Sequence, residues 1–223
     1  MTAKVVTVFN QKGGCGKTTL CMQLAGSIGL RGYKTLVVDM DPQGTAIRWS
    51  AAASEEQPFP AAVMSLAPME GRMHREVKNY IASYDIIFID CPPAMNSAVP
   101  TSAMLISDLA LIPVVPSPAD IWAAEAAKRL AQTASVTNEG LLTRVAPNMV
   151  QRQTSLAKDL LEVLDEDENF KVLSNHLASR SAFRECQIMG STVHNVPRAQ
   201  TAIAELEALT NEILELLNLG TKH

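Results

Sequence analysis

The sequence predicts an α/β fold in which helices cover both faces of a doubly wound, mostly parallel sheet. Short apolar runs of strand length alternate with segments of helical spacing along the 223 residues. The apolar runs lack regular polar positions, as is typical of parallel strands that are buried on both faces. A glycine-rich turn joins the first strand to the first helix, and ligands of such sheets bind beyond the carboxyl ends of the strands.

The elements can be assigned in chain order from apolar periodicity and from the turn residues between them. We expect strands at residues 5–9, 35–38, 61–66, 86–89, 109–115, 143–146 and 172–173. We expect helices at about residues 17–31, 43–52, 70–83, 96–107, 118–135, 154–165, 180–189 and 198–218. Residues 54–60 are acidic, contain two prolines and should form a surface loop. Because no repeat or linker divides the chain, we expect a single domain over residues 1–223.

Composition excludes several classes of protein. A hydrophobic content of 47% over 24.1 kDa can fill the core of one sizeable domain. The N-terminal residues do not resemble a signal peptide, and the densest apolar stretch, 109–115, is short and contains Pro113, so we expect no membrane span. The four cysteines lack C-x-x-C spacing and are expected to be reduced thiols in the cytoplasm. With a net charge of −4, binding to a polyanion would need a local basic patch.

The strongest functional signal is the turn at residues 10–19, which reads NQKGGCGKTT. Gly13, Gly14 and Gly16 allow the backbone to approach an anion closely, and the following helix directs its positive end at the same point. Lys17 would contact the β- and γ-phosphates, and the Thr18 hydroxyl is placed for Mg²⁺. The turn therefore predicts a nucleotide site.

Carboxylates follow two of the expected strands. Asp39 and Asp41 lie two residues apart at the end of the second strand, so both side chains can face a phosphate or its metal. Asp90 ends an apolar strand, which is the pattern of an aspartate that holds Mg²⁺ directly or through water. The alternative for each aspartate alone is a cap for the next helix.

One departure from the usual phosphate-loop pattern is informative. The pattern G-x-x-x-x-G-K-[ST] requires glycine where Gln11 stands, and the chain instead offers a second lysine, Lys12, in K-G-G-x-G-K-T-T. This variant resembles the deviant Walker A loop of the ParA/MinD family of P-loop ATPases. The resemblance continues through V-D-x-D-P-Q-G at residues 38–44 and through residues 111–120, and it covers most of residues 4–130 strongly.

The resemblance implies a slow, partner-stimulated ATPase with the P-loop fold, with ATP and Mg²⁺ as cofactors. The implied phosphate-binding residues are Lys12, Gly13, Gly14, Cys15, Gly16, Lys17, Thr18 and Thr19. Lys12 would reach across a dimer interface to the partner's nucleotide, and Lys17 would act on the nucleotide of its own subunit. Asp41 would orient the attacking water.

The same resemblance assigns the metal and the base. Asp39 and Asp90 would join Thr18 in the Mg²⁺ shell. Asn148, which follows a strand, is the candidate adenine reader, with an ordinary turn asparagine as the alternative. Pro197 would line the base from the other side.

The partners are also implied by the resemblance. Short family members begin at the first strand, as this chain does, and are expected to form ATP-bound homodimers that bind DNA without sequence preference. Candidate phosphate contacts are Arg152, Arg180, Arg184 and Arg198. We expect a cytoplasmic, nucleoid-associated protein that partitions a plasmid or chromosome region together with a ParB-like adaptor. The alternative cargo is a protein assembly, such as a carboxysome or a chemoreceptor cluster.

Three other classes are less compatible with the sequence. A MinD-like membrane ATPase would need a basic amphipathic tail, but the polar face of residues 199–217 carries Glu205, Glu207, Glu212 and Glu215, so this helix should pack on the domain and no membrane partner is expected. The cysteines do not match the cluster ligands of a nitrogenase iron protein. A metabolic enzyme such as dethiobiotin synthetase is disfavoured by Lys12 and by residues 39–43.

Overall fold

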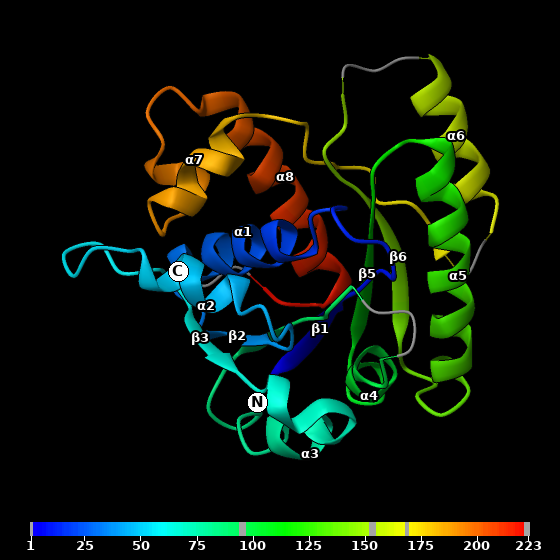
Figure 1. Cartoon of the computed structure of the whole chain (residues 1–223), viewed down its shortest axis with the longest axis horizontal. Coiled ribbons are helices and arrows are strands. Elements are labelled where there is room, and N and C mark those ends of the chain that lie inside the picture. Colours follow the sequence, from blue (N-terminus) through cyan, green and yellow to red (C-terminus); the bar gives the residue numbers. More distant parts are fainter. Residues whose placement is uncertain (1, 94–96, 152–154, 168–169, 221–223) are drawn as a thin grey trace.

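Parallel strands form the centre of the molecule in the order β3-β2-β4-β1-β5-β6 (Figure 1). The computed structural model describes residues 2–93, 97–151, 155–167 and 170–220. Its strands are β1 (Lys4–Val8), β2 (Thr35–Asp39), β3 (Ala62–Ser65), β4 (Ile86–Asp90), β5 (Leu109–Val114) and β6 (Leu142–Pro147). Each neighbouring pair is parallel, which confirms the predicted fold class.

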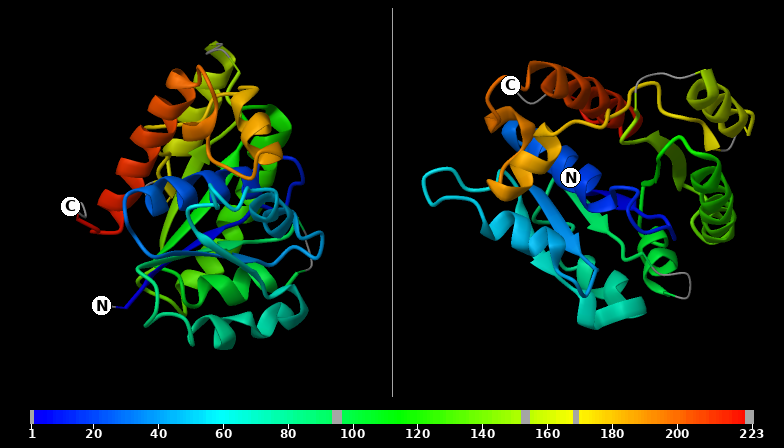
Figure 2. Two further views of the ribbon diagram at one scale, coloured as in Figure 1. Left: turned by 90° about the vertical axis from the view of Figure 1, so that its left-hand side faces the viewer. Right: turned by 45° about the horizontal axis from the view of Figure 1, so that its top comes forward.

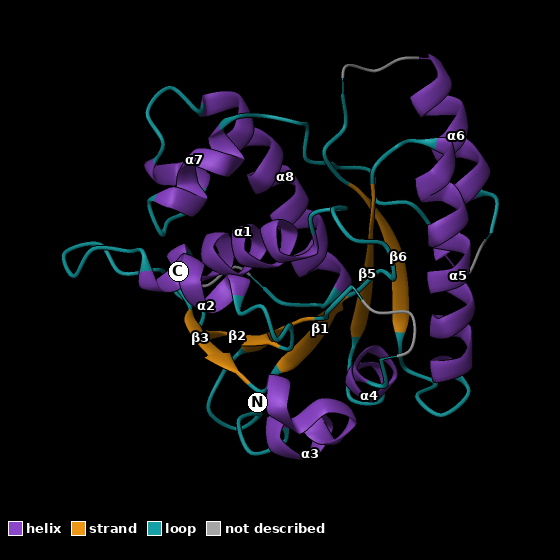
Figure 3. Ribbon diagram, in the orientation of Figure 1, coloured by secondary structure: helices purple, strands orange, loops and turns teal. Residues whose placement is uncertain are grey.

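Helices cover both faces of the sheet (Figure 3). In chain order they are α1 (Lys17–Leu30), α2 (Thr45–Ala51), η1 (Ala67–Arg72), α3 (Met73–Val77), α4 (Val99–Met104), α5 (Pro118–Ser135), α6 (Ser155–Asp165), α7 (Ala182–Ile188), η3 (Val193–Asn195) and α8 (Gln200–Leu216). In the views of Figures 1 and 2, α1, α7 and α8 lie on one face and α3 and α4 on the other, with α5 beside β6.

Alternation of buried side chains along the strands builds two separate cores. Ile86 and Phe88 of β4 pack with α1, α7 and α8, whereas Ile87 and Ile89 pack with α3, α4 and α5. Successive side chains of a strand point to opposite faces, so one apolar strand supplies both layers. The uninterrupted apolar runs seen in the sequence therefore have a direct structural cause.

The expected strand at residues 172–173 is not a strand of the sheet. Val172 forms only an isolated bridge with Val145. The Leu173 amide still donates to the Val145 carbonyl of β6 at 2.8 Å, but the amides of Ser174 and Asn175 donate to the Glu212 carboxylate of α8 at 2.8 and 2.9 Å. The chain leaves β6 after Leu173 because the amides of the next two residues find their acceptor on α8.

The expected helix at residues 70–83 is also wrong in detail. The segment forms the 3-10 helix η1 and the five-residue α3, and residues 78–83 are turns. Glu70 adopts φ 44° inside η1, a conformation that interrupts a helix. The expected loop at residues 54–60 is present and protrudes beside α2 (Figure 1).

Helix α8 packs on the domain, as predicted for the C-terminal segment. Leu206, Leu209 and Ile213 are fully buried in the core that α8 shares with α1. Within the described residues, no helix is long and apolar enough to cross a membrane.

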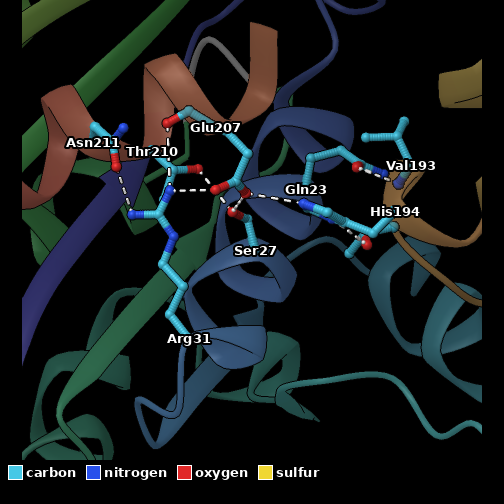
Figure 4. A network of polar contacts seen from close by, with 9 residues as sticks. Gln23, Ser27, Arg31, Val193, His194, Glu207, Thr210 and Asn211 are labelled. Carbon is cyan, nitrogen blue, oxygen red and sulfur yellow. Dashed lines mark hydrogen bonds and ion pairs between the residues drawn. The ribbon is translucent and has the colours of Figure 1, made fainter. Parts of the chain in front are cut away.

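Acidic side chains of α8 hold neighbouring segments in place, and Figure 4 shows the contacts of one of them, Glu207. Glu207 accepts hydrogen bonds from Ser27 Oγ at 2.7 Å and Arg31 Nη2 at 2.6 Å, and its Oε1 lies 2.9 Å from His194 Nε2. Glu205 pairs with Arg180, and Glu212 holds residues 174–175. The acidic face is thus largely a set of structural contacts, and those of Glu207 hold α1, whose first residue belongs to the glycine-rich turn.

Replacing Glu207 by Gln should lower the free energy of unfolding by about 1–2 kcal/mol, because it removes charge-assisted bonds from a carboxylate that is only partly exposed. Burial alone would raise the pKa of Glu207, but the bonds from Ser27, Arg31 and His194 lower it. The deficit should therefore be present at neutral pH and shrink as the pH falls below the ordinary value of 4.5. Urea denaturation at several pH values measures it.

The matched control is Glu215→Gln, which changes an exposed glutamate of the same helix. It should shift the unfolding free energy by less than about 0.5 kcal/mol. Equal effects of the two substitutions would contradict a clamping role for Glu207.

Candidate functional site

The carboxyl ends of β1, β2 and β4 bring the predicted site residues together. In the sheet register, Asp90 of β4 pairs with Asp39 of β2 on one side and with Val8 of β1 on the other. Residues 9–16, which contain the glycine-rich turn, leave the sheet directly after Val8 and lead into α1. The two aspartates and the turn therefore occupy one edge of the sheet.

The turn requires glycine at two positions. Gly14 and Gly16 both adopt φ +80°, in the left-handed region that disfavours other residues. A Cβ atom at Gly16 would also lie 2.4 Å from Nδ2 of Asn148. Glycine thus permits both the backbone conformation and the close approach of the residues that follow β6.

Lys17 is a buried cation at the start of α1. Its residue surface is only 6% exposed, and its Nζ donates to the carbonyl of Lys12 at 2.8 Å. Among the described residues, no carboxylate forms an ion pair with it. A buried ammonium without a counter-ion at a helix N-terminus favours an anion, so the turn fits a phosphate group.

Thr18 and Asp90 form the most informative contact of the site. Thr18 Oγ1 donates to Asp90 Oδ2 at 2.6 Å, whereas the buried Oδ1 of Asp90 has no hydrogen-bond partner in the described part of the chain. Burial, with a smaller contribution from the charge of Asp39, raises the pKa of Asp90 to about 7, although the hydrogen bond from Thr18 acts in the opposite direction. A hydroxyl beside a carboxylate with an unused oxygen is a donor set that fits Mg²⁺.

Asp39 has a different set of contacts. Its Oδ1 accepts from the amide of Asp41 at 3.0 Å, and its Oδ2 accepts from the amides of Ala46 and Ile47 at 3.0 and 3.2 Å. Burial raises the pKa of Asp39, although these amide hydrogen bonds act in the opposite direction. Asp39 therefore caps α2 in this structure, and its role in a metal shell stays a prediction.

Asp41 is half-buried, and its Oδ1 accepts from the amide of Gln43 at 2.9 Å. The turn of residues 41–44 then ends at Gly44, with φ +62°, where α2 begins. Asp41 lies beside the Asp39–Asp90 edge, and its water-orienting role stays a prediction. Thr19 is half-buried in the first turn of α1, and its predicted contact is likewise untested.

The two residues predicted to contact the base differ in their placement. Asn148 is buried, and its Nδ2 donates to the carbonyls of Cys15 at 2.9 Å and Gly16 at 3.3 Å. It therefore supports the glycine-rich turn, a contact that the sequence analysis missed. Pro197 is exposed between η3 and α8. Their contacts with a base stay predictions.

Lys12 has a partner that the sequence analysis did not identify. Its Nζ forms an ion pair with Asp120 Oδ2 at 2.7 Å. Asp120 lies in the first turn of α5, which Ser117 caps by accepting from the Asp120 amide. The sequence S-P-A-D at residues 117–120 matches the capping pattern [ST]-x-x-[DE], and that signal could have located the carboxylate.

The predicted DNA-contacting arginines are not equivalent. Arg152 lies outside the described residues. Arg180 is paired with Glu205, at 3.0 Å from its Nε to Oε2, and this contact raises the pKa of the guanidinium. Arg184 and Arg198 are exposed and form no ion pair with other described residues. Arg180 and Arg198 line a cavity of about 290 Å³ at the start of α8.

Comparison with known proteins agrees with this geometry. Residues 6–193 match the model of the CobQ/CobB/MinD/ParA nucleotide-binding domain. The chain is 29% identical over 213 residues to "Maintenance of carboxysome distribution protein A" of Halothiobacillus neapolitanus, covering 95% of this chain and 97% of the relative. It is 27% identical over 174 residues to "Chromosome partitioning protein ParA" of Myxococcus xanthus, covering 62% and 60% of the two chains.

A solved structure gives the same fold. The ATP complex of a variant of McdA from Cyanothece superposes with a TM-score of 0.80 over 100% of this chain and 99% of the other, at 15% identity. The family match confirms the predicted resemblance to ParA/MinD proteins, the predicted ATPase class and the predicted cofactors, ATP and Mg²⁺.

The raised pKa of Asp90 predicts a stability cost. Because the folded protein keeps this proton up to about pH 7 and the unfolded chain loses it near 3.8, the contribution of Asp90 to stability falls as the pH rises through this window. We therefore compare the free energies of unfolding of Asp90→Asn and wild type in Mg²⁺-free buffer. As the pH is raised from 5 to 8, the difference should move in favour of Asp90→Asn by on the order of 2 kcal/mol.

Urea denaturation at both pH values measures the difference. Asp108→Asn is the control, since Asp108 is a partly exposed carboxylate paired with Lys4 far from this edge. Parallel pH profiles for wild type and Asp90→Asn would contradict a buried Asp90 carboxyl with a raised pKa.

Proposed function

The chain belongs to the CobQ/CobB/MinD/ParA nucleotide-binding domain family, and we propose that it is a positioning ATPase that dimerises with ATP, binds DNA without sequence preference and distributes a cargo. The observation that carries this proposal is the placement of Lys17 and the Thr18–Asp90 pair at one edge of the sheet. We further propose that residues 1–223 act as a single ATPase domain.

The proposed reaction is transfer of the γ-phosphoryl group to water. The amides of residues 13–17 and the Lys17 ammonium bind the phosphates. Thr18 Oγ1 and Asp90 would hold Mg²⁺, with Asp39 as a further candidate, and the bound metal would neutralise charge between the β- and γ-phosphates. Asp41, which lies beside these groups, accepts a hydrogen bond from the attacking water and orients it.

Lys12 makes this reaction depend on a second subunit. A cation supplied by a partner subunit would act as an arginine finger does, by stabilising the charge of the transition state, and an arginine finger raises kcat by about 10³–10⁵-fold. Turnover is then slow until two subunits meet, so that ATP favours the dimer and hydrolysis releases it. Asn148 supports the glycine-rich turn of its own subunit through the Cys15 carbonyl. Together with Pro197, it is also the candidate contact for the adenine ring.

The DNA-binding surface is small in this proposal. Arg184 and Arg198 are the candidates available for phosphates, because Arg180 is already paired with Glu205. With a net charge of −4 per chain, a monomer offers little attraction for DNA. A dimer presents each arginine twice, so DNA binding would accompany ATP binding, and the protein would be cytoplasmic and nucleoid-associated.

The cargo has two candidates. The first is a plasmid or chromosome region bound by a ParB-like adaptor. The second is a protein assembly such as a carboxysome, and it is supported by the 29% identity of this chain to a carboxysome distribution protein. The gene beside this one separates them, since a DNA-binding adaptor would indicate partition and a shell-associated protein would indicate assembly positioning.

Asp41→Ala should separate nucleotide binding from hydrolysis. The variant should keep ATP affinity near that of the wild type and lose at least about ten-fold in kcat, because a positioned catalytic group is removed while the phosphate-binding residues stay. Lys17→Ala is the contrast and should bind ATP poorly. Phosphate release and ATP titration measure both effects, and wild-type hydrolysis by Asp41→Ala would assign the water-orienting role elsewhere, with Asp39 the next candidate.

DNA binding should require ATP and weaken steeply with salt. If Arg184 and Arg198 of both subunits each neutralise one phosphate, the slope of log K against log salt should be about −3.6. Arg184→Glu or Arg198→Glu should reduce that slope by at least about 1.8 and leave basal ATP turnover nearly unchanged. Gel-shift titrations with ATP, ADP and no nucleotide measure this.

Arg48→Glu is the control, because Arg48 is an exposed arginine of α2 outside the proposed patch. A complete lack of binding to non-specific duplex with ATP at low salt would exclude the nucleoid as the supporting surface. Co-sedimentation with anionic vesicles would then test the membrane alternative.

A further inference from the structure

The ammonium of Lys12 is held inside its own subunit. Its side chain is 36% exposed, but the Asp120 side chain that it contacts at 2.7 Å is only 5% exposed. Ser117 Oγ also donates to Asp120 Oδ2, and the amide of Asp120 donates to the Ser117 carbonyl at 3.0 Å. The carboxylate is thus a fixed acceptor at the beginning of α5, and Lys12 is directed toward it.

The backbone of Lys12 is fixed as well. Its amide donates to Asn10 Oδ1 at 3.0 Å, and its carbonyl accepts from Lys17 Nζ at 2.8 Å. Asn10 in turn donates to the carbonyl of Pro113 at 2.9 Å, which anchors this part of the turn to β5. Lys12 is therefore held at both ends, by β5 through its backbone and by α5 through its ammonium.

We propose that Asp120 is a positioning residue that retains Lys12 in its own subunit and competes for it with the phosphates of a nucleotide bound by a second copy of this chain. The inference rests on the ATP-dependent dimer of the proposed function. Breaking the pair leaves a buried carboxylate without its cation, which is costly. Each subunit must therefore exchange this contact for the new one before Lys12 can act across an interface.

The Lys12–Asp120 ion pair should raise the dissociation constant of the dimer, because it must break when the dimer forms. With a non-hydrolysable ATP analogue and Mg²⁺, Asp120→Asn should dimerise with a dissociation constant roughly ten-fold lower than wild type, because the competing charge is gone. Ser117→Ala, which loosens the same carboxylate, should shift it in the same direction by a smaller factor. Asp120→Glu keeps the charge and should restore values close to wild type. Sedimentation velocity measures all three.

Two controls assign the effect to Lys12. Asp108→Asn removes a carboxylate from the remote Lys4–Asp108 pair and should leave the dissociation constant unchanged. In a Lys12→Ala background, Asp120→Asn should produce no further shift, because the retained cation is already absent. A shift of equal size in both backgrounds would overturn the proposal, as would weaker dimerisation of Asp120→Asn.

A second readout does not depend on dimers. In nucleotide-free protein, brief acylation of amines followed by mass spectrometry should modify Lys12 several-fold faster in Asp120→Asn than in wild type, with exposed Lys78 as the internal reference. Equal rates at Lys12 would overturn the retention whatever the state of assembly. If wild type forms no ATP dimer while Lys12 still reacts faster in the variant, the proposed dimer fails and the retention of Lys12 stands.

Discussion

The buried carboxylate of Asp90 is the constraint on which the rest of the site depends. It lies between β1 and β2 in the sheet register, with one oxygen bonded to Thr18 and the other without a partner among the described residues. A sheet selected for stability alone would not place a carboxylate there. Lys17 is a buried cation at the start of α1 and has no ion pair among the described residues, so a carboxylate suited to a metal and an ammonium suited to a phosphate occupy the same edge of the sheet.

Helix α8 shows why the C-terminal segment is acidic without being a surface for ligands. Three of its glutamates are occupied: Glu205 by Arg180, Glu207 by α1 and η3, and Glu212 by residues 174–175. The contacts of Glu207 with Ser27 and Arg31 hold the C-terminal end of α1, the helix that begins at Lys17. The acidity that argues against lipid binding therefore has a structural purpose.

The sequence predicted what depends on local pattern and on general rules of parallel sheets. The glycine-rich turn and the meeting of Asp39 with Asp90 follow from residue type and from the common edge of parallel strands. In contrast, the Lys12–Asp120 contact spans 108 positions of the sequence and the Asn148–Cys15 contact spans 133. No local rule predicts contacts over such separations. The expected strand at residues 172–173 was wrong for the same reason, because the distant Glu212 carboxylate accepts from the amides of Ser174 and Asn175, and the pairing with β6 ends at Leu173.

The two lysines of the turn are linked through a single peptide group. Lys17 Nζ donates to the carbonyl of Lys12, whose own ammonium is held by Asp120. A phosphate carries more charge than a carbonyl oxygen and competes for Lys17, so an anion in the turn acts directly on the backbone that supports Lys12. Substitution of Lys12 therefore alters the environment of Lys17 little, since the carbonyl stays, whereas movement of Lys17 removes a bond from Lys12. Because a coupling free energy is reciprocal, any effect of an anion at Lys17 on the retention of Lys12 is matched by an equal effect of that retention on anion binding.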